Sequence, residues 1–356
     1  MTRELVFHLG DRKTGSTSIQ ATLRSQNWEG GGSTIGYPAR LHCGEVAKSL
    51  AGRLLKGDGN RPIRKLRERV NANQADIAVI SSEDFEVVDA QRLAGMLDQY
   101  FTEFRHDTRL IAYVRPHADR ILSSYSERVK LGLVDESLET FVESVIRNRR
   151  FQYHDRFRKW RSVFGDRFEL RPMIRANLHM NCVVRDFLSF TLQSTDFKLL
   201  SEPASNTSLS VKDLAMLIEL HRQIGSSPAE RTSLQSVGRN LGIVLSEMPM
   251  DGWPRVTFNH ALSRKVIEAH REDAERLDTA FFADFPMSEA LEASSAKAVD
   301  ALPSILPEDN FSPGELRMLR VWATMVGQMY RSNPKGWSRH FSLLRLGVTA
   351  EDDDEA

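Results

Sequence analysis

The fold is decided by the stretch Phe7-His8-Leu9-Gly10-Asp11-Arg12-Lys13-Thr14-Gly15-Ser16-Thr17-Ser18-Ile19-Gln20 near the N-terminus. Residues 4–9 form a short apolar run that ends at Gly10, which predicts a buried strand. Helical spacing begins near Ser16 and continues to about Ser25. A tight loop between a strand and a helix turns backbone N–H groups toward one point, and the helix N-terminus adds partial positive charge. The stretch therefore predicts an anion-binding loop.

This loop has only part of the pattern of an ATP-binding P-loop, Gly-x4-Gly-Lys-[Ser/Thr]. Gly10 and Gly15 have the spacing of that pattern. Ser16, however, stands at the position of the lysine, and the lysine lies earlier, at Lys13. The next apolar run, residues 77–80, leads into Ser-Ser-Glu rather than into a metal-binding aspartate. A metal-dependent nucleotide hydrolase is disfavoured, and a phosphoryl-transfer enzyme remains the first alternative.

A second strand-to-helix junction carries an arginine and a serine eight residues apart. Residues 110–114 predict a buried strand, and Pro116 suits the first turn of the helix that follows it. Arg115 then lies at the carboxyl end of a strand, where ligands bind in open α/β sheets, and Ser123 lies about two helical turns further on. An arginine fork with a hydroxyl suits a terminal phosphate. The alternative is an arginine that caps a strand and a serine on a solvated helix face.

Together these motifs resemble those of sulfotransferases that use 3′-phosphoadenosine 5′-phosphosulfate (PAPS). The run from Lys13 to Ser18 resembles their 5′-phosphosulfate loop, and Arg115 with Ser123 resembles their 3′-phosphate motif, in the same order along the chain. The resemblance is to bacterial carbohydrate-type sulfotransferases. It extends over residues 1–210, is faint over 211–300 and is absent beyond.

The resemblance implies a PAPS donor, a PAP product, no required metal, and a hydroxyl or amine acceptor, with a glycan favoured. It implies that Arg115 and Ser123 hold the 3′-phosphate. The residues that it implies for the 5′-phosphosulfate are Lys13, Thr14, Gly15, Ser16, Thr17 and Ser18. Lys13 and the loop N–H groups would also stabilise charge on the transferring group and on the leaving oxygen. Asn206 and Ser208 are further possible nucleotide contacts, although a helix N-cap explains them equally well.

The general base is expected just past the second strand. Glu83 follows the apolar run 77–80, and related glycan sulfotransferases often use a glutamate in a comparable place while others use a histidine. This favours Glu83 as the base; its alternative is a solvated acid, with Asp84 as a helix cap. His8 is a weaker candidate because its place within the first strand suits a core histidine. His117 is expected to be exposed.

Composition excludes several other classes of function. The chain has 356 residues, 41% of them apolar, which is typical of a globular protein. Its 48 basic and 48 acidic residues balance, so the chain lacks the basic excess that is typical of nucleic-acid-binding proteins. Its two cysteines, Cys43 and Cys182, predict free thiols rather than a disulfide framework or a zinc site. The N-terminus has no apolar stretch of the length of a signal peptide or membrane anchor, which predicts a cytoplasmic protein without a membrane span.

The order of elements predicts an α/β class, with a P-loop NTPase-like parallel sheet flanked by helices and a mainly helical C-terminal half. The strands are expected at 4–9, 77–80, 110–114 and 167–173, and the main later helices at 183–190, 211–224, 262–282 and 313–330. The predicted domains are a PAPS-binding core over 1–210, a helical elaboration of it over 211–302, and an extension over 303–356 that ends in an acidic, disordered tail. A nucleotide-binding module without catalysis is the second alternative, because one fold hosts many functions.

Overall fold

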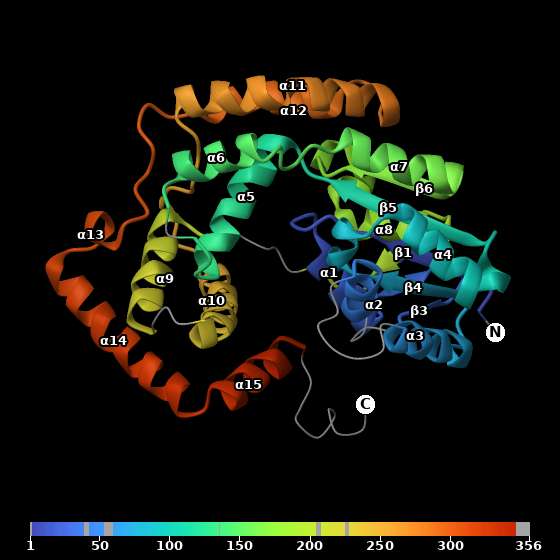
Figure 1. The fold of residues 1–356 in the computed structure, drawn as a ribbon, viewed down its shortest axis with the longest axis horizontal. Coiled ribbons are helices and arrows are strands. Elements are labelled where there is room, and N and C mark those ends of the chain that lie inside the picture. The colour runs from blue at the N-terminus through green and yellow to red at the C-terminus, as the bar shows by residue number, and fades with distance from the viewer. Residues whose placement is uncertain are drawn as a thin grey trace. The chain divides into compact units, whose positions relative to one another are not determined.

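The computed structural model describes residues 2–38, 43–52, 60–134, 136–203, 208–224 and 228–346; the acidic tail and Asn206 lie outside them. The chain divides into two compact units (Figure 1). The first unit comprises residues 1–120, 151–204 and 270–292, and the second comprises 121–150, 205–269 and 293–356. The chain crosses between the units five times, and three of these crossings fall within helices, namely α5 (His117–Lys130), α11 (His260–Phe281) and the last turn of α12 (Pro286–Ala293). The predicted domain boundaries at 210 and 302 stay a prediction.

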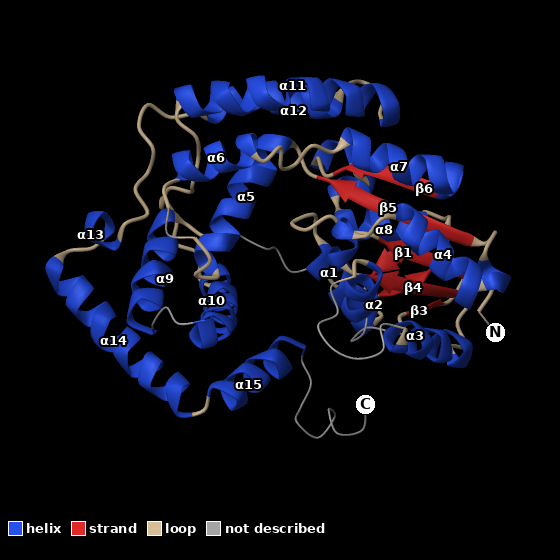
Figure 2. Cartoon of the chain, viewed as in Figure 1, coloured by secondary structure: helices blue, strands red, loops and turns tan. Residues whose placement is uncertain are grey.

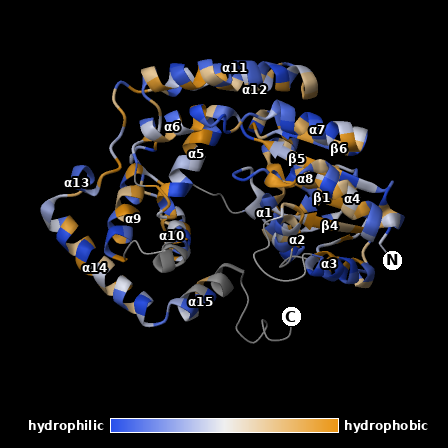
Figure 3. Ribbon diagram, in the orientation of Figure 1, coloured by the Kyte–Doolittle hydropathy of each residue, from blue (hydrophilic) through white to orange (hydrophobic). Residues whose placement is uncertain are grey.

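The first unit is built on a five-stranded parallel sheet of order β3-β4-β1-β5-β6 (Figure 2). Its strands are β1 (Glu4–His8), β3 (Ile35–Gly36), β4 (Ile77–Ser81), β5 (Thr108–Val114) and β6 (Phe168–Pro172). β1, β4 and β5 are mostly apolar and buried, so both faces of the sheet can be covered there, whereas the edge strand β6 alternates buried and half-buried residues; Figure 3 shows the hydrophobic residues along β1 and β4. The predicted parallel α/β sheet is confirmed. Because the strands are parallel, the loops after β1, β4 and β5 leave from one edge of the sheet.

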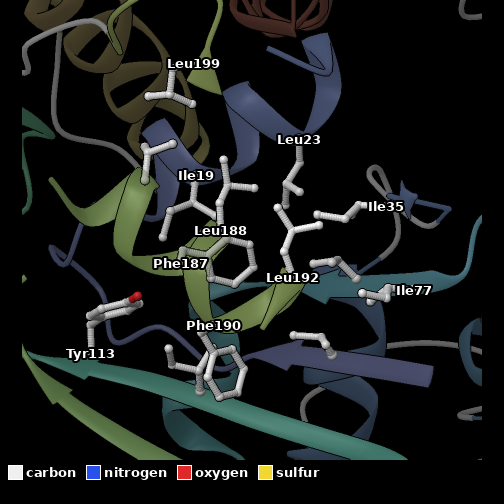
Figure 4. Close-up of a cluster of buried hydrophobic side chains, with 14 of the residues drawn as sticks. Ile19, Leu23, Ile35, Ile77, Tyr113, Phe187, Leu188, Phe190, Leu192 and Leu199 are labelled. Atoms are coloured by element: carbon white, nitrogen blue, oxygen red, sulfur yellow. The ribbon is translucent and has the colours of Figure 1, made fainter. Parts of the chain in front are cut away.

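One face of this sheet is covered by α1 (Ser16–Ser25) and α8 (Val183–Leu192), which pack against each other. Figure 4 shows the buried cluster there, in which Ile77 and Tyr113 of the sheet meet Ile19 and Phe187 of the two helices. Alternate strand residues face the other side. There Phe7 of β1 meets Phe85 edge to face, with ring centroids 5.8 Å apart. Full burial of each such side chain contributes about 1.5–3 kcal/mol.

The first unit also contains further helices and a separate antiparallel pair of strands, whose Leu199 belongs to the same buried cluster. The pair is β2 (Trp28–Gly30) with β7 (Phe197–Leu199). The helices are α2 (Cys43–Leu50), α3 (Arg61–Ala72), α4 (Ala90–Tyr100), α7 (His154–Phe164) and α12 (Pro286–Ala293), joined by the later part of α11. Cys43 and Cys182 are not joined in a disulfide, as predicted.

The second unit is helical, which confirms the prediction for the C-terminal half. Its helices are the later part of α5, then α6 (Leu138–Arg147), α9 (Val211–Ile224), α10 (Pro228–Glu247), the start of α11, α13 (Pro307–Asn310), α14 (Pro313–Ser332) and α15 (Pro334–Leu346). Leu217 and Leu220 of α9 form a buried cluster with Ala323 and Tyr330 of α14. Within the described part of the chain, no helix combines the length and apolar character needed to cross a membrane.

Candidate functional site

The loop between β1 and α1 has the backbone geometry of an anion-binding loop. Gly10, Lys13 and Gly15 all have positive φ, at 86°, 66° and 85°. Gly15 is the N-cap of α1 and has no side chain with which to cap the helix. The first-turn N–H groups of a helix have no intrahelical acceptor, and the helix dipole makes this end positive. The loop can therefore present backbone donors and partial positive charge to an anion.

Two glycines let other parts of the chain approach the loop closely. A Cβ atom on Gly15 would lie 2.7 Å from Cγ1 of Val183, at the start of α8. A Cβ atom on Gly10 would lie 3.1 Å from the Cα atom of Glu83. Glu83 begins the 3₁₀ helix η1 (Glu83–Val87), which follows β4. The absence of a side chain at Gly10 thus allows the backbone of Glu83 to pack directly against the loop.

The predicted loop hydroxyls divide into two pairs. Thr14 is fully buried and donates a hydrogen bond from Oγ1 to the carbonyl of Asp11 at 2.5 Å; the buried Ser16 hydroxyl donates to the same carbonyl at 3.4 Å. These two side chains hold the loop in shape. Thr17 is exposed and Ser18 is half-buried, and among the residues that the structure describes neither hydroxyl has a hydrogen-bond partner. Their hydroxyls are the ones open to a ligand.

Arg115 lies against this loop. It follows β5 directly, is half-buried, and donates from Nη1 to the backbone carbonyl of Lys13 at 3.3 Å. Burial lowers the pKa of Arg115 below its ordinary value. The structure therefore brings two of the predicted ligand residues, Arg115 and Lys13, into contact. Ser123 is half-buried in the part of α5 that belongs to the second unit.

A buried ion pair anchors the loop to α7. The Asp11 side chain is 2% exposed, and Arg156 donates to its two carboxylate oxygens at 2.7 and 2.5 Å. Burial lowers the pKa of Arg156, but the Asp11 carboxylate outweighs this and raises it above the ordinary value. Such a bidentate ion pair fixes the relative orientation of the two side chains as well as neutralising their charges. The only local sign of this ion pair in the sequence is an acidic residue inside a glycine-containing loop. The partner arginine lies 145 residues further along the chain.

Two further arginines connect the loop to the acids of η1. Arg120 donates to the backbone carbonyl of Arg12 and, at 2.8 Å, to Oε1 of Glu86. The backbone N–H of Arg12 donates to Oε2 of Glu86 at 3.4 Å. The Arg12 guanidinium forms an ion pair with Asp84, and its Nε lies 3.9 Å from Oε1 of Glu83. Paired charges thus enclose the loop, and two of them, Arg120 and Glu86, belong to neither sequence motif.

Glu83 lies beside the loop. Its side chain is 49% exposed, so its carboxylate is open to solvent while its backbone packs on Gly10. The alternative role of Asp84 as a helix cap is wrong. Ser82 caps η1, because its Oγ accepts a hydrogen bond from the backbone N–H of Asp84 at 3.1 Å.

The two candidate histidines are both buried. His8 is fully buried, and its Nδ1 is hydrogen-bonded to Oγ of Ser81 at 2.8 Å. Burial lowers the pKa of His8 to about 3, so the ring is neutral at pH 7, which confirms it as a core histidine.

The expectation that His117 is exposed is wrong, because its exposed fraction is 0%. Its Nε2 is hydrogen-bonded to Oδ2 of Asp273 on α11 at 2.9 Å. Asp273 also accepts backbone N–H groups from Tyr153 at 2.7 Å and from His154 at 3.1 Å. Burial raises the pKa of Asp273, but the bond from His117 and these two backbone donors outweigh it and lower the pKa overall. The carboxylate thereby joins the starts of α5 and α7.

The remaining nucleotide candidate with a described position is Ser208. It lines a cleft of about 530 Å³ in the second unit together with Trp253, whose ring lies 5.0 Å from the ammonium group of Lys212. Trp253 is half-buried at this cleft rather than part of a core.

Comparison with family models and with curated proteins finds no match. Among solved structures, the chain is similar to the crystal structure of a sulfotransferase from Alicyclobacillus acidocaldarius, with 16% sequence identity and a TM-score of 0.44. The alignment covers 79% of this chain and 96% of that chain.

Proposed function

We propose that this protein is a sulfotransferase that moves a sulfuryl group from PAPS to a hydroxyl or amine acceptor, with a glycan as the favoured class. One observation carries the proposal. The strand–loop–helix segment has its lysine, Lys13, ahead of Gly15, and a half-exposed carboxylate, Glu83, packs beside Gly10 in the same loop. This combines an anion site with a neighbouring proton acceptor.

The donor would be held at its two anionic ends. We propose that the 5′-phosphosulfate binds the N–H groups at the start of α1, the hydroxyls of Thr17 and Ser18, and the ammonium group of Lys13. Thr14, Gly15 and Ser16 supply the shape and backbone of the loop. Arg115 is the proposed contact of the 3′-phosphate, with Ser123 as the second contact that the motif predicts. A guanidinium that already touches the loop backbone is well placed to fix one donor end relative to the other.

The reaction that this arrangement supports is an in-line displacement at sulfur. The acceptor oxygen or nitrogen attacks sulfur, and a new S–O or S–N bond forms. The bond from sulfur to the bridging oxygen of the 5′-phosphate breaks, and PAP leaves with that electron pair. Glu83 takes the proton of the acceptor. Lys13 and the loop N–H groups stabilise the charge that develops on the sulfonate and on the leaving oxygen.

The proposal is tested by turnover in EDTA with PAPS and a panel of glycan, hydroxyl and amine acceptors, followed through PAP release. We expect Glu83→Gln to bind PAP as the unmodified protein does and to lose about 10²–10⁴-fold in turnover, the usual contribution of a general base. Glu29→Gln is the matched control, since Glu29 is an exposed glutamate on β2. Absence of transfer with tight PAP binding would favour a binding module, and a requirement for Mg²⁺ with ATP as donor would favour a phosphoryl-transfer enzyme.

A further inference from the structure

Helix α14 of the second unit has two apolar faces. Leu316, Ala323 and Tyr330 lie on one of them and are buried in packing against α9. The other face carries five large apolar side chains that remain exposed, at 63%, 55%, 61%, 51% and 52% in chain order. They are Met318, Val321, Trp322, Met325 and Met329, and we call them the α14 stripe. A helix needs only one apolar face to join its own core, so the second face indicates a partner.

The spacing within the stripe is that of a helix–helix seam. Met318, Trp322, Met325 and Met329 are separated by four, three and four residues. Residues three and four apart lie on one face of a helix, and this alternation is the a/d repeat by which two helices interdigitate. The same spacing on an identical helix would supply matching knobs and holes, so the stripe is complementary to itself.

Charge does not oppose self-pairing. Arg320 is held by Glu219, with Nε 2.9 Å from Oε1, and Arg331 donates to the carbonyl of Ile224 at 3.1 Å, so both are drawn toward α9. Glu315 is occupied in a capping box with Ser312 at the start of the helix. In the heptad register of the seam, the flanking e and g positions are uncharged, namely Leu319, Val321, Val326 and Gln328. The exposed Arg317 lies near one end of the stripe, so an antiparallel second copy places its own Arg317 at the opposite end.

The exposed area is large enough for a dimer. At roughly 100 Å² for each side chain, the α14 stripe exposes on the order of 500 Å², and two copies would bury on the order of 1,000 Å², near the lower bound for a specific interface. An antiparallel arrangement also places opposite ends of the two helix dipoles together.

We propose that the α14 stripe is the two-fold interface of a homodimer, in which α14 of one copy packs antiparallel on α14 of a second copy. In this arrangement Met318 faces Met329 of the second copy, and Trp322 faces Met325. Thioether groups beside an indole ring add favourable contacts. The proposal does not depend on the catalytic activity proposed above.

The test is sedimentation equilibrium over a dilution series, with the double variant Met318→Glu/Met325→Glu beside the unmodified protein. We expect a monomer–dimer equilibrium whose dissociation constant rises at least about a hundredfold in the double variant, because two carboxylates would be buried without partners. Met180→Glu is the matched control, since Met180 is 66% exposed in the first unit. Circular dichroism checks that each variant is folded.

Three results would overturn the proposal. They are a monomer at every concentration of the unmodified protein, a dimer that survives the double substitution, and equal weakening by Met180→Glu. Flotation of the monomer with lipid vesicles, lost in the double variant, would assign the stripe to a membrane surface instead.

Discussion

At the scale of single residues, the ion pairs Asp11–Arg156 and Arg120–Glu86 hold the loop after β1 to its neighbours. The sequence placed Glu83 near the loop that contains Lys13, and the Glu83 backbone does pack on Gly10, because the loop and Glu83 each follow a buried strand of the same parallel sheet. It could not identify Arg156 or Asp273, because ion pairs across more than a hundred residues leave no local pattern. The burial of His117 could not be predicted for the same reason, because Asp273, which contacts its ring, comes from α11.

The Asp11–Arg156 pair gives the first stability prediction. Arg156→Ala leaves the 2%-exposed Asp11 carboxylate without its partner, and breaking a buried pair in this way costs about 3 kcal/mol in the free energy of unfolding. Urea unfolding measures the loss. Arg158→Ala, an exposed position on the same helix, should change stability by less than about 0.5 kcal/mol. Equal losses in both variants would show that the pair is not what anchors the loop.

His8 gives a prediction about pH. Burial depresses its pKa to about 3, below the ordinary 6.5, so between these values the unfolded chain binds a proton that the folded chain does not. The free energy of unfolding therefore falls as the pH drops from about 6.5 toward 3, by up to about 1.4 kcal/mol per pH unit from this group. Denaturant unfolding at several pH values should give a shallower slope for His8→Gln. His106→Gln, at an exposed histidine, should keep the original slope.

At the scale of elements, the sequence predicted β1, β4 and β5 closely because each contains an apolar run, and β6 lies within the expected range 167–173. It missed β2, β3 and β7, which have two or three residues each and no apolar run. It also missed α10, whose interior contains Gly238 and Gly242. A glycine usually weakens a helix, but here Cβ atoms at these positions would meet the backbone oxygen of Lys130 at 1.9 Å and its Cδ at 2.4 Å. Close packing, which no local pattern records, explains these glycines.

Gly15 tests the packing of α1 on α8. Gly15→Ala combines a φ of 85° with a Cβ atom 2.7 Å from Val183, whereas Gly32→Ala has a φ of 72° and no atom within 4 Å. Strain alone costs roughly 1–2 kcal/mol, and overpacking adds about 1–3 kcal/mol. Gly15→Ala should therefore lower the free energy of unfolding more than Gly32→Ala does in urea titrations. The reverse order would contradict the close approach of α8 to the loop.

At the scale of the whole molecule, the α/β class and the helical second half follow from the order of elements along the chain. The division into two units does not follow from that order, because the segments of the two units alternate along the chain and α5 and α11 each contribute to both. Local periodicity describes one element at a time, so it cannot tell that residues 270–292 return to the first unit. The expected core over residues 1–210 ends where the recognisable sequence motifs end. The two compact units are instead defined by the contacts between residues, which the motifs do not determine.

The central claim, a metal-free site for a nucleotide with two anionic ends, is tested most directly by calorimetry of PAP binding in EDTA. The proteins to compare are the unmodified chain, Lys13→Ala, Arg115→Ala and the control Lys198→Ala, at an exposed lysine on β7. We expect PAP to bind tightly without metal, with binding weakened about tenfold or more by each of the first two substitutions and unchanged in the control. Failure of PAP to bind, or binding that needs Mg²⁺ and prefers ATP, would contradict the claim and favour phosphoryl transfer.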